Sequence, residues 1–121
     1  MSAAQNHSEP YGALTPAMFH VLLALAADDL HGYAILKEVE QRTGGKVQLS
    51  TGTLYGIIKR LVDDGLIVER RSRPAESDDE RRRYYRLTSQ GRRVATAEAE
   101  RMDELLSVAR SRNLLKKPRM A

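Results

Sequence analysis

The sequence contains no cysteine and no apolar stretch long enough to cross a membrane. The lack of cysteine excludes disulfides, zinc–thiolate sites and thiol nucleophiles. A membrane-spanning helix needs about 18–20 consecutive apolar residues, and the opening residues MSAAQNHSEPYG do not form a secretory signal. We therefore expect a soluble cytoplasmic protein, whose 121 residues fit one domain with a small core.

The sequence also lacks the short motifs of common enzyme classes. It has no glycine-rich phosphate loop followed by lysine, no HExxH zinc motif and no nucleophile–base spacing. The histidines His7, His20 and His31 are scattered, and surface or capping roles suit them better than metal binding. We therefore expect no catalytic residue, no metal and no cofactor.

Positive charge is concentrated in one part of the chain. Lysine and arginine number 20 against 16 acidic residues, and the isoelectric point is about 9.6. Between Glu69 and Arg93 there are nine arginines and five acidic residues, a local excess of four positive charges. Clustered arginine is typical of surfaces that bind polyanions such as nucleic acids.

Capping residues and hydrophobic periodicity predict the secondary structure. We expect helices from Thr15-Pro16 to about Ala27, over 33–43 and over 50–64, and a last helix from about Ser89 to Arg112. We expect a turn at 28–32, a short strand or extended link at 46–50, and a β-hairpin from 66–73 and 81–88 around a polar loop. Gly44-Gly45 and Gly65 should end the second and third helices.

This order of elements predicts a fold that is α+β and mainly α, a winged helix-turn-helix domain followed by a C-terminal dimerisation helix. The second and third helices would form the helix-turn-helix unit, and the hairpin would be the wing. The chain then divides into a flexible arm (1–13), the DNA-binding domain (14–88), the dimerisation helix (89–112) and a basic tail (113–121).

The third expected helix, STGTLYGIIKRLVDDG, begins with poor helix formers. A glycine inside a helix costs about 1 kcal/mol relative to alanine, and this helix contains both Gly52 and Gly56. On a helical wheel, Leu54, Ile57, Ile58 and Leu61 gather on one side, with Val62 at its margin. The opposite side carries mainly small and polar residues, with Tyr55 on a flank.

That opposite side suits contact with DNA. Backbone amides and the dipole at a helix N-terminus favour phosphate, hydroxyl groups donate hydrogen bonds, and glycines allow a close approach. The candidate DNA-binding residues of this segment are Ser50, Thr51, Gly52, Thr53, Tyr55, Lys59 and Arg60. The alternative is that Ser50 and Thr51 only cap the helix and that Tyr55 is a half-buried surface aromatic.

The second group of candidate DNA contacts lies in the expected wing. Arg81, Arg82 and Arg83 are consecutive and stand where a wing would approach phosphates. The alternative is that they only face solvent, or that the acidic residues at 76–80 neutralise them.

The last expected helix carries an apolar stripe. Ala95, Ala99, Met102, Leu106 and Ala109 step by 4, 3, 4 and 3 residues, which is a coiled-coil spacing, and Leu105 and Val108 widen the stripe. The expected dimer interface comprises Ala95, Ala99, Met102, Leu105, Leu106 and Ala109. The alternative is that this helix packs back on the first helix of its own chain.

Three blocks of this sequence resemble the PadR family of bacterial transcriptional regulators. They are HGYAILKEVE, LSTGTLYGIIKRLVDDGLIVERR and RRRYYRLTSQGRR, and the likeness covers about residues 14–112. The resemblance implies a winged-helix DNA-binding domain, a C-terminal dimerisation helix and repression relieved by a small ligand. By the motif match, Tyr55 corresponds to the tyrosine of the recognition helix and Tyr33 to the tyrosine that opens the second helix, so Tyr33 joins the candidate DNA contacts.

The chain departs from the family pattern in two places. Gly56 stands where the family often has proline, and no tryptophan is available to stack a planar drug in the dimer helix. The single C-terminal helix is similar to that of the short subfamily.

We therefore expect a sequence-specific transcriptional regulator, a ligand-responsive repressor that binds an inverted-repeat operator as a homodimer. The expected partners are double-stranded DNA, a second copy of the chain and a small-molecule effector. The alternative function is a winged helix that contacts proteins and does not bind DNA.

Overall fold

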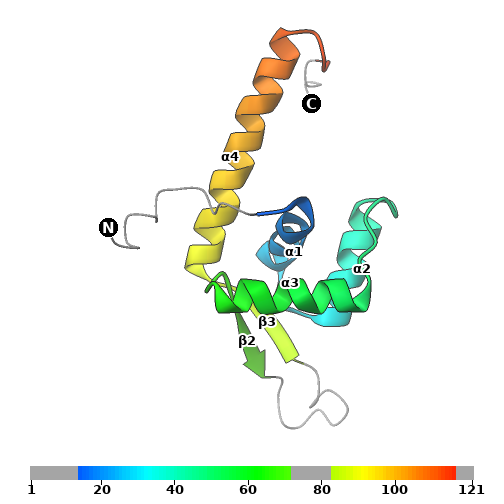
Figure 1. Cartoon of the computed structure of the whole chain (residues 1–121), viewed down its shortest axis with the longest axis vertical. Helices are drawn as coiled ribbons and strands as arrows, with labels where there is room; N and C mark the ends of the chain where they lie inside the picture. Colours follow the sequence, from blue (N-terminus) through cyan, green and yellow to red (C-terminus); the bar gives the residue numbers. More distant parts are fainter. Residues whose placement is uncertain (1–13, 72–82, 117–121) are drawn as a thin grey trace.

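The computed structural model describes residues 14–71 and 83–116. The expected N-terminal arm, the wing loop with Arg81 and Arg82, and the end of the basic tail lie outside these ranges. The described elements are α1 (Pro16–Ala27), β1 (Leu30–His31), α2 (Gly32–Arg42), α3 (Thr51–Asp63), β2 (Ile67–Arg71), β3 (Arg83–Leu87) and α4 (Ser89–Ser111). This mainly helical arrangement with a small antiparallel sheet, drawn in Figure 1, confirms the expected winged-helix fold class.

The sheet contains one strand more than the expected hairpin. Its order is β1-β3-β2, and both pairings are antiparallel. The expectation of a plain turn over 28–32 was therefore wrong, because Leu30 and His31 pair with Tyr85 and Tyr84 of β3. A strand of two residues has no periodicity in the sequence, and its pairing depends on where β3 lies.

Residues 46–50 form no strand, so of the two alternatives that the sequence left open, a short strand or an extended link, this segment is the extended link.

The helix ends follow the expected capping signals. At each described helix start a side chain accepts a hydrogen bond from a backbone N–H three residues on, at 2.9–3.2 Å. These capping side chains belong to Thr15, His31, Ser50 and Thr88. His31 thus has one of the two roles expected for the histidines. Gly65 adopts a φ of 78°, which confirms it as the left-handed residue after α3.

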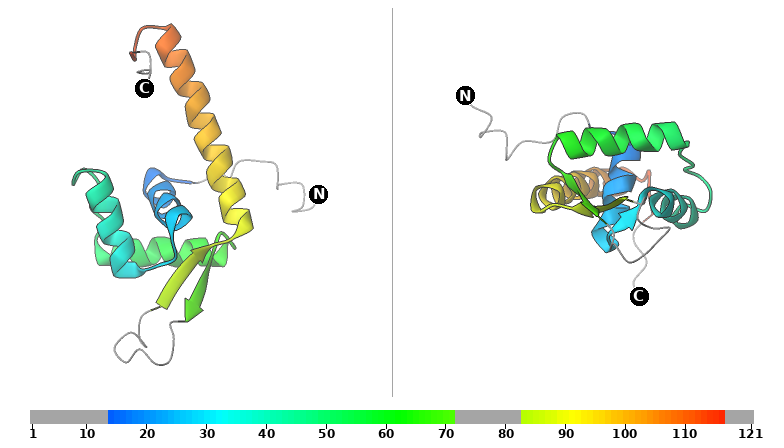
Figure 2. Two further views of the ribbon diagram at one scale, coloured as in Figure 1. Left: turned by 180° about the vertical axis from the view of Figure 1, so that it is seen from behind. Right: turned by 90° about the horizontal axis from the view of Figure 1, so that it is seen from below.

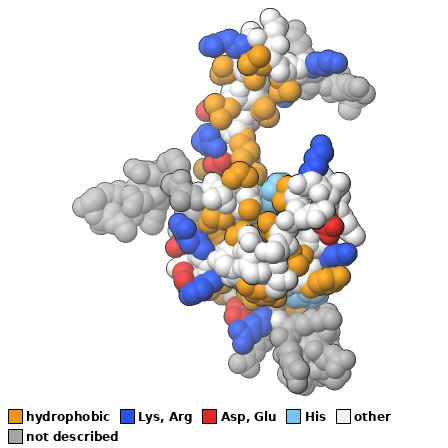
Figure 3. Space-filling view, turned by 45° about the vertical axis from the view of Figure 1, so that its right-hand side comes forward, with side chains coloured by type: hydrophobic (Ala, Val, Ile, Leu, Met, Phe, Trp, Pro, Cys, Tyr) orange, Lys and Arg blue, Asp and Glu red, His pale blue; other side chains and the backbone are white. Residues whose placement is uncertain are grey.

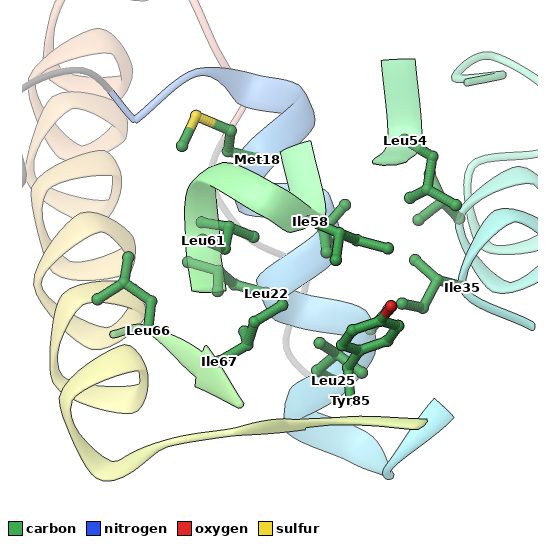
Figure 4. Close-up of a cluster of buried hydrophobic side chains, with 13 residues drawn as sticks. Met18, Leu22, Leu25, Ile35, Leu54, Ile58, Leu61, Leu66, Ile67 and Tyr85 are labelled. Carbon is green, nitrogen blue, oxygen red and sulfur yellow. The ribbon is translucent and has the colours of Figure 1, made fainter. Parts of the chain in front are cut away.

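The core lies between the three short helices and the sheet. Figure 4 shows side chains from α1, α2, α3, β2 and β3 converging on it. Helix α3 buries Leu54, Ile58 and Leu61, as its hydrophobic pattern predicted, and Ile57 and Val62 are half-buried beside them. The burial of this face fixes the opposite face of α3 toward solvent.

Helix α4 begins against the core and then leaves it. Its first turns pack beside α1, where Val94 and Ala95 contact the core. Figures 1 and 2 show the rest of α4 rising clear of the other described helices and strands. The expected alternative, packing of α4 on α1, therefore applies only to the base of this helix. None of the described helices combines the length and apolar content that a bilayer crossing requires.

Candidate DNA-binding surface

The solvent-facing side of α3 is formed by small and hydroxyl-bearing residues. Thr51, Gly52, Thr53 and Gly56 are exposed, and Tyr55 has an exposed fraction of 46%. A Cβ atom added at Gly52 or Gly56 would meet no described atom within 4 Å. The two glycines are therefore not required by packing within the described chain, and their effect is to leave the backbone of α3 open to approach from outside.

Part of the hydroxyl chemistry at the start of α3 is used inside the helix. The Ser50 hydroxyl oxygen accepts a hydrogen bond from the Thr53 backbone N–H at 3.1 Å. The same hydroxyl donates to the Thr53 hydroxyl oxygen at 3.0 Å. Ser50 is thus a helix cap, which is one part of the alternative interpretation, whereas Thr51 is the first residue of α3 and not a cap.

Tyr55 lies across the junction of α3 with α2. A Cβ atom on Gly32 would collide with the Tyr55 hydroxyl, so the phenol ring lies directly against the first residue of α2. Tyr33, which follows Gly32, has an exposed fraction of 64%. The structure therefore places the two candidate tyrosines, 22 positions apart in the sequence, on adjoining parts of one surface.

Lys37 is a cation on this surface that the sequence analysis missed. Its ammonium nitrogen lies 5.8 Å from the centroid of the Tyr33 ring, within the range of a cation–π interaction. The two residues are four positions apart on α2, which places them on the same helix face. That spacing was a usable signal once Tyr33 had been singled out.

The two cations of α3 are paired with the last residue of the helix, Asp63, and with its C-cap, Asp64. Lys59 contacts the Asp63 carboxylate at 3.2 Å, and Arg60 contacts the Asp64 carboxylate at 3.3 Å. Exposed pairs of this kind contribute about 0–1 kcal/mol. A phosphate can therefore displace Asp63 from Lys59 at little cost in free energy.

The wing contributes one described member of the expected arginine cluster. Arg83 is exposed and contacts the Glu69 carboxylate of the neighbouring strand at 3.3 Å. The acids expected to oppose the cluster lie at 76–80, outside the described ranges, whereas Glu69 had not been considered. Burial raises the pKa of the Tyr85 phenol, which is opposite Glu69 in the sheet, above its ordinary value, and the nearby Glu69 and Tyr55 add to the shift.

The expected dimer interface occupies the projecting part of α4. Leu105, Leu106 and Val108 are exposed there, and Met102 and Ala109 are half-buried. Figure 3 shows hydrophobic side chains along this projecting helix. Ala99 is exposed as well, whereas Ala95 packs partly against the core of its own chain.

The apolar surface continues past the end of α4. Asn113 has a φ of 64°, and the Leu114 N–H donates to the Ala109 carbonyl at 2.9 Å, a Schellman-type ending. Leu114 and Leu115, just beyond it, are exposed. Together with Leu105, Leu106 and Val108, they form a group of exposed aliphatic side chains at the C-terminal end of α4.

A surface hollow of about 720 Å³ lies along the first half of α4. Its lining runs from Leu87 and Thr88, at the end of the wing, to Glu100 of α4, and includes Arg92 and Arg93. Within residues 14–71 and 83–116, no three histidine or acidic side chains are grouped as metal ligands would be.

Curated proteins with similar sequences include a named regulator. "Transcriptional regulator Rv3488" of Mycobacterium tuberculosis is 37% identical over 86 residues, which covers 71% of this chain and 75% of that protein. An "uncharacterized 37.1 kDa protein in transposon TN4556" of Streptomyces fradiae is 40% identical over 89 residues, covering 74% of this chain. The aligned part is only 24% of the length of the Streptomyces protein.

The similarity extends to solved structures and to a family profile. A PadR family transcription regulator from Clostridium difficile R20291 shares 28% identity with a TM-score of 0.69, covering 78% of this chain and 94% of that one. The profile of the "Transcriptional regulator PadR-like family" matches residues 21–97, more than half of the chain. That description is of a regulator, which supports the expectation that the chain is not an enzyme. The winged-helix geometry, the exposed α3 and this match together show that the chain belongs to the PadR-like family of transcriptional regulators.

Proposed function

We propose that this protein is a homodimeric transcriptional repressor that reads an inverted-repeat operator with α3. The observation that carries the proposal is the solvent-facing side of α3, where two glycines and two threonines leave the backbone open beside Tyr55. An α-helix with such a side fits the major groove, where base edges can be distinguished. We propose that Tyr55 contacts bases and that Tyr33, Lys37, Lys59 and the wing arginines contact phosphates.

A solved relative supports the choice of DNA as partner. Bacillus subtilis PadR, solved in complex with operator DNA, shares the fold, with 21% identity and a TM-score of 0.61 over 70% of this chain. Arginine and lysine around α3 and on the wing fit the same kind of partner. A regulator of this kind acts where the chromosome lies, so we place it in the cytoplasm.

The projecting half of α4 supports a homodimer. A helix with an uncovered apolar stripe gains stability by pairing with a second such helix, and a coiled-coil spacing of 4 and 3 residues allows side chains to interlock. A twofold axis would then relate the two α3 helices. Two such helices enter successive major grooves about 34 Å apart, which requires an inverted-repeat operator.

A small effector is part of the proposal. The hollow along α4 is lined by the end of β3, the Thr88 cap and the first turns of α4, so it adjoins both the wing and the base of the dimer helix. A ligand there would contact the segment that joins the DNA-binding domain to the proposed dimer helix α4. By binding one arrangement of that segment better than another, it could change the angle between the two DNA-binding domains of the dimer. The guanidinium groups of Arg92 and Arg93, which line the hollow, favour an anionic effector.

Selection of bound fragments from random duplex DNA tests the function. The wild-type protein should enrich a sequence with twofold symmetry, and Tyr55→Ala should fail to enrich it while keeping its fold and its oligomeric state. The alternative of a protein-contact module predicts no enrichment and no salt-dependent retention on duplex DNA. That result would overturn the proposed function.

A further inference from the structure

One carboxylate holds two arginines of the wing. The Asp29 Oδ2 atom lies 3.3 Å from Nη1 of Arg70 on β2 and 3.2 Å from both Nε and Nη2 of Arg86 on β3. The Asp29 side chain is 28% exposed, and the two arginines are 50% and 54% exposed. The group therefore lies at the surface, where a phosphate could compete with the carboxylate for both guanidinium groups. Asp29 is less exposed than Asp63, whose side chain is 60% exposed, and it has two guanidinium partners instead of one ammonium, so a phosphate displaces it less readily.

The strand register places this group on the outer face of the sheet. Arg70 is opposite Tyr84, and Val68 is opposite Arg86. Neighbouring positions of the strands, Ile67 and Tyr85, are buried against the core, and strand residues alternate between the two faces. Arg70, Tyr84 and Arg86 therefore share the face that points away from the core.

That outer face adjoins the candidate DNA-binding surface. His31 is opposite Tyr84 in the sheet, and their rings meet edge to face with centroids 5.4 Å apart. His31 is also the cap of α2, whose first residues are Gly32 and Tyr33. His31 and Tyr84 therefore connect the start of α2, where Tyr33 lies, with the strand position of Arg70.

We propose that Asp29 is an internal counter-ion that keeps Arg70 and Arg86 from binding phosphate, and that it thereby limits the non-specific affinity of the protein for DNA. A carboxylate and a phosphate compete for the same charge-assisted hydrogen bonds of a guanidinium group. Non-specific binding depends mainly on the number of neutralised phosphates, whereas sequence is read by base contacts. Withholding two arginines therefore lowers the sequence-independent part of the affinity, and Asp29 acts as a positioning residue for Arg70 and Arg86.

This inference rests on the proposed DNA binding, and the salt dependence of binding to random duplex DNA tests it. Two additional phosphate contacts would steepen the plot of log affinity against log salt by up to about 1.8 in the Asp29→Asn variant. The affinity gain of this variant should then shrink by up to about twelvefold between about 50 and about 200 mM salt. Affinity for the operator should rise as well, since phosphate contacts strengthen specific and non-specific binding alike.

A matched control separates this effect from a general loss of negative charge. Asp28 is the neighbouring acid, and its carboxylate accepts a hydrogen bond from the Asp29 backbone N–H at 2.9 Å, which asparagine can preserve. Asp28→Asn changes the net charge by the same amount and should leave the slope unchanged. In an Arg70→Gln/Arg86→Gln background, Asp29→Asn should no longer steepen the slope.

The remaining outcomes each decide the matter. Equal slopes for Asp28→Asn and Asp29→Asn would show a general charge effect and overturn the inference. Weaker binding of Asp29→Asn at an unchanged slope would show that Asp29 only stabilises the position of the wing strands. That result would overturn the inference as well. If the wild-type protein shows no salt-dependent binding to duplex DNA, the proposed function fails first and the inference fails with it.

Discussion

The ring of Tyr55 lies so close to Gly32 that no side chain fits at residue 32 without displacing the phenol. The start of α2 and the exposed side of α3 are therefore coupled through one tyrosine. Because the atom in the way is the far end of a side chain and not backbone, the fold can absorb a small change at residue 32 by moving Tyr55.

Tyr55→Ala should weaken operator binding by about 1–3 kcal/mol, the range of a direct base contact. The side chain is about half exposed, so the loss of stability should be small. Fluorescence anisotropy with the selected operator measures the affinity, and thermal unfolding provides the control. Unchanged affinity in a folded Tyr55→Ala protein would show that Tyr55 does not contribute to operator binding.

Gly32→Ala should also weaken operator binding, although residue 32 need not touch DNA. The new methyl group has to push the Tyr55 ring from its position. In a Tyr55→Ala background the same change should have little further effect, since the two substitutions act through one side chain. Additive losses in this double-mutant cycle would refute the coupling.

Gly56→Ala should raise the stability of the fold and lower the affinity for DNA. Alanine is favoured over glycine in an exposed helix by about 1 kcal/mol, and the space next to Gly56 is open. Gly91→Ala is the contrasting variant, because its Cβ would collide with the Leu66 carbonyl and should cost about 1–3 kcal/mol or more. Urea denaturation separates the two cases, and full operator affinity of Gly56→Ala would show that α3 needs no close approach.

Replacing Arg81, Arg82 and Arg83 together by alanine should weaken specific and non-specific binding alike. Each lost phosphate contact lowers the steepness of the log affinity–log salt plot by about 0.9 on B-DNA. Arg83 already has Glu69 as a partner, so its own contribution should appear only where DNA displaces that carboxylate. A salt titration that gives the wild-type slope would mean that these arginines only face solvent.

Leu106→Glu should convert the dimer to a monomer and abolish operator binding although α3 is untouched. The substitution would bury an unpaired charge at the proposed interface, at a cost of about 3–5 kcal/mol. Ser107→Glu introduces the same charge at the next, exposed position of α4 and should remain dimeric. Light scattering measures the mass of each variant. A dimeric Leu106→Glu protein that binds its operator normally would contradict both the interface and the symmetry argument.

Unfolding at alkaline pH should reveal the buried Tyr85. Its pKa is raised in the folded protein, chiefly by burial, so the phenol stays protonated to a higher pH than in the unfolded chain. The contribution of this group is complete below about pH 10, the ordinary pKa of tyrosine, and is lost as the pH rises through the folded-state pKa. Tyr85→Phe should lose less stability than the wild type as the pH rises above about 10. Parallel losses would contradict the assignment.

The sequence alone determined the elements whose signals lie within a few consecutive residues. The apolar positions of α3 recur at the helical period, so its buried and exposed sides followed directly from the pattern, and Thr15, Ser50 and Thr88 mark helix starts by local hydrogen bonds. The stripe on α4 and the family resemblance were visible for the same reason. These features depend on spacing along the chain and not on the position of distant segments.

Only the tertiary structure decided which distant residues meet. β1 has two residues and exists because β3 passes beside it. Asp29 meets Arg70 and Arg86, which are 41 and 57 positions away, and Tyr55 meets Gly32 across the junction of two helices. Such contacts are set by how the helices and the sheet pack around the buried core, and no pattern among neighbouring residues encodes them. Local periodicity thus identified the surface of α3, whereas packing determined which side chains lie beside it.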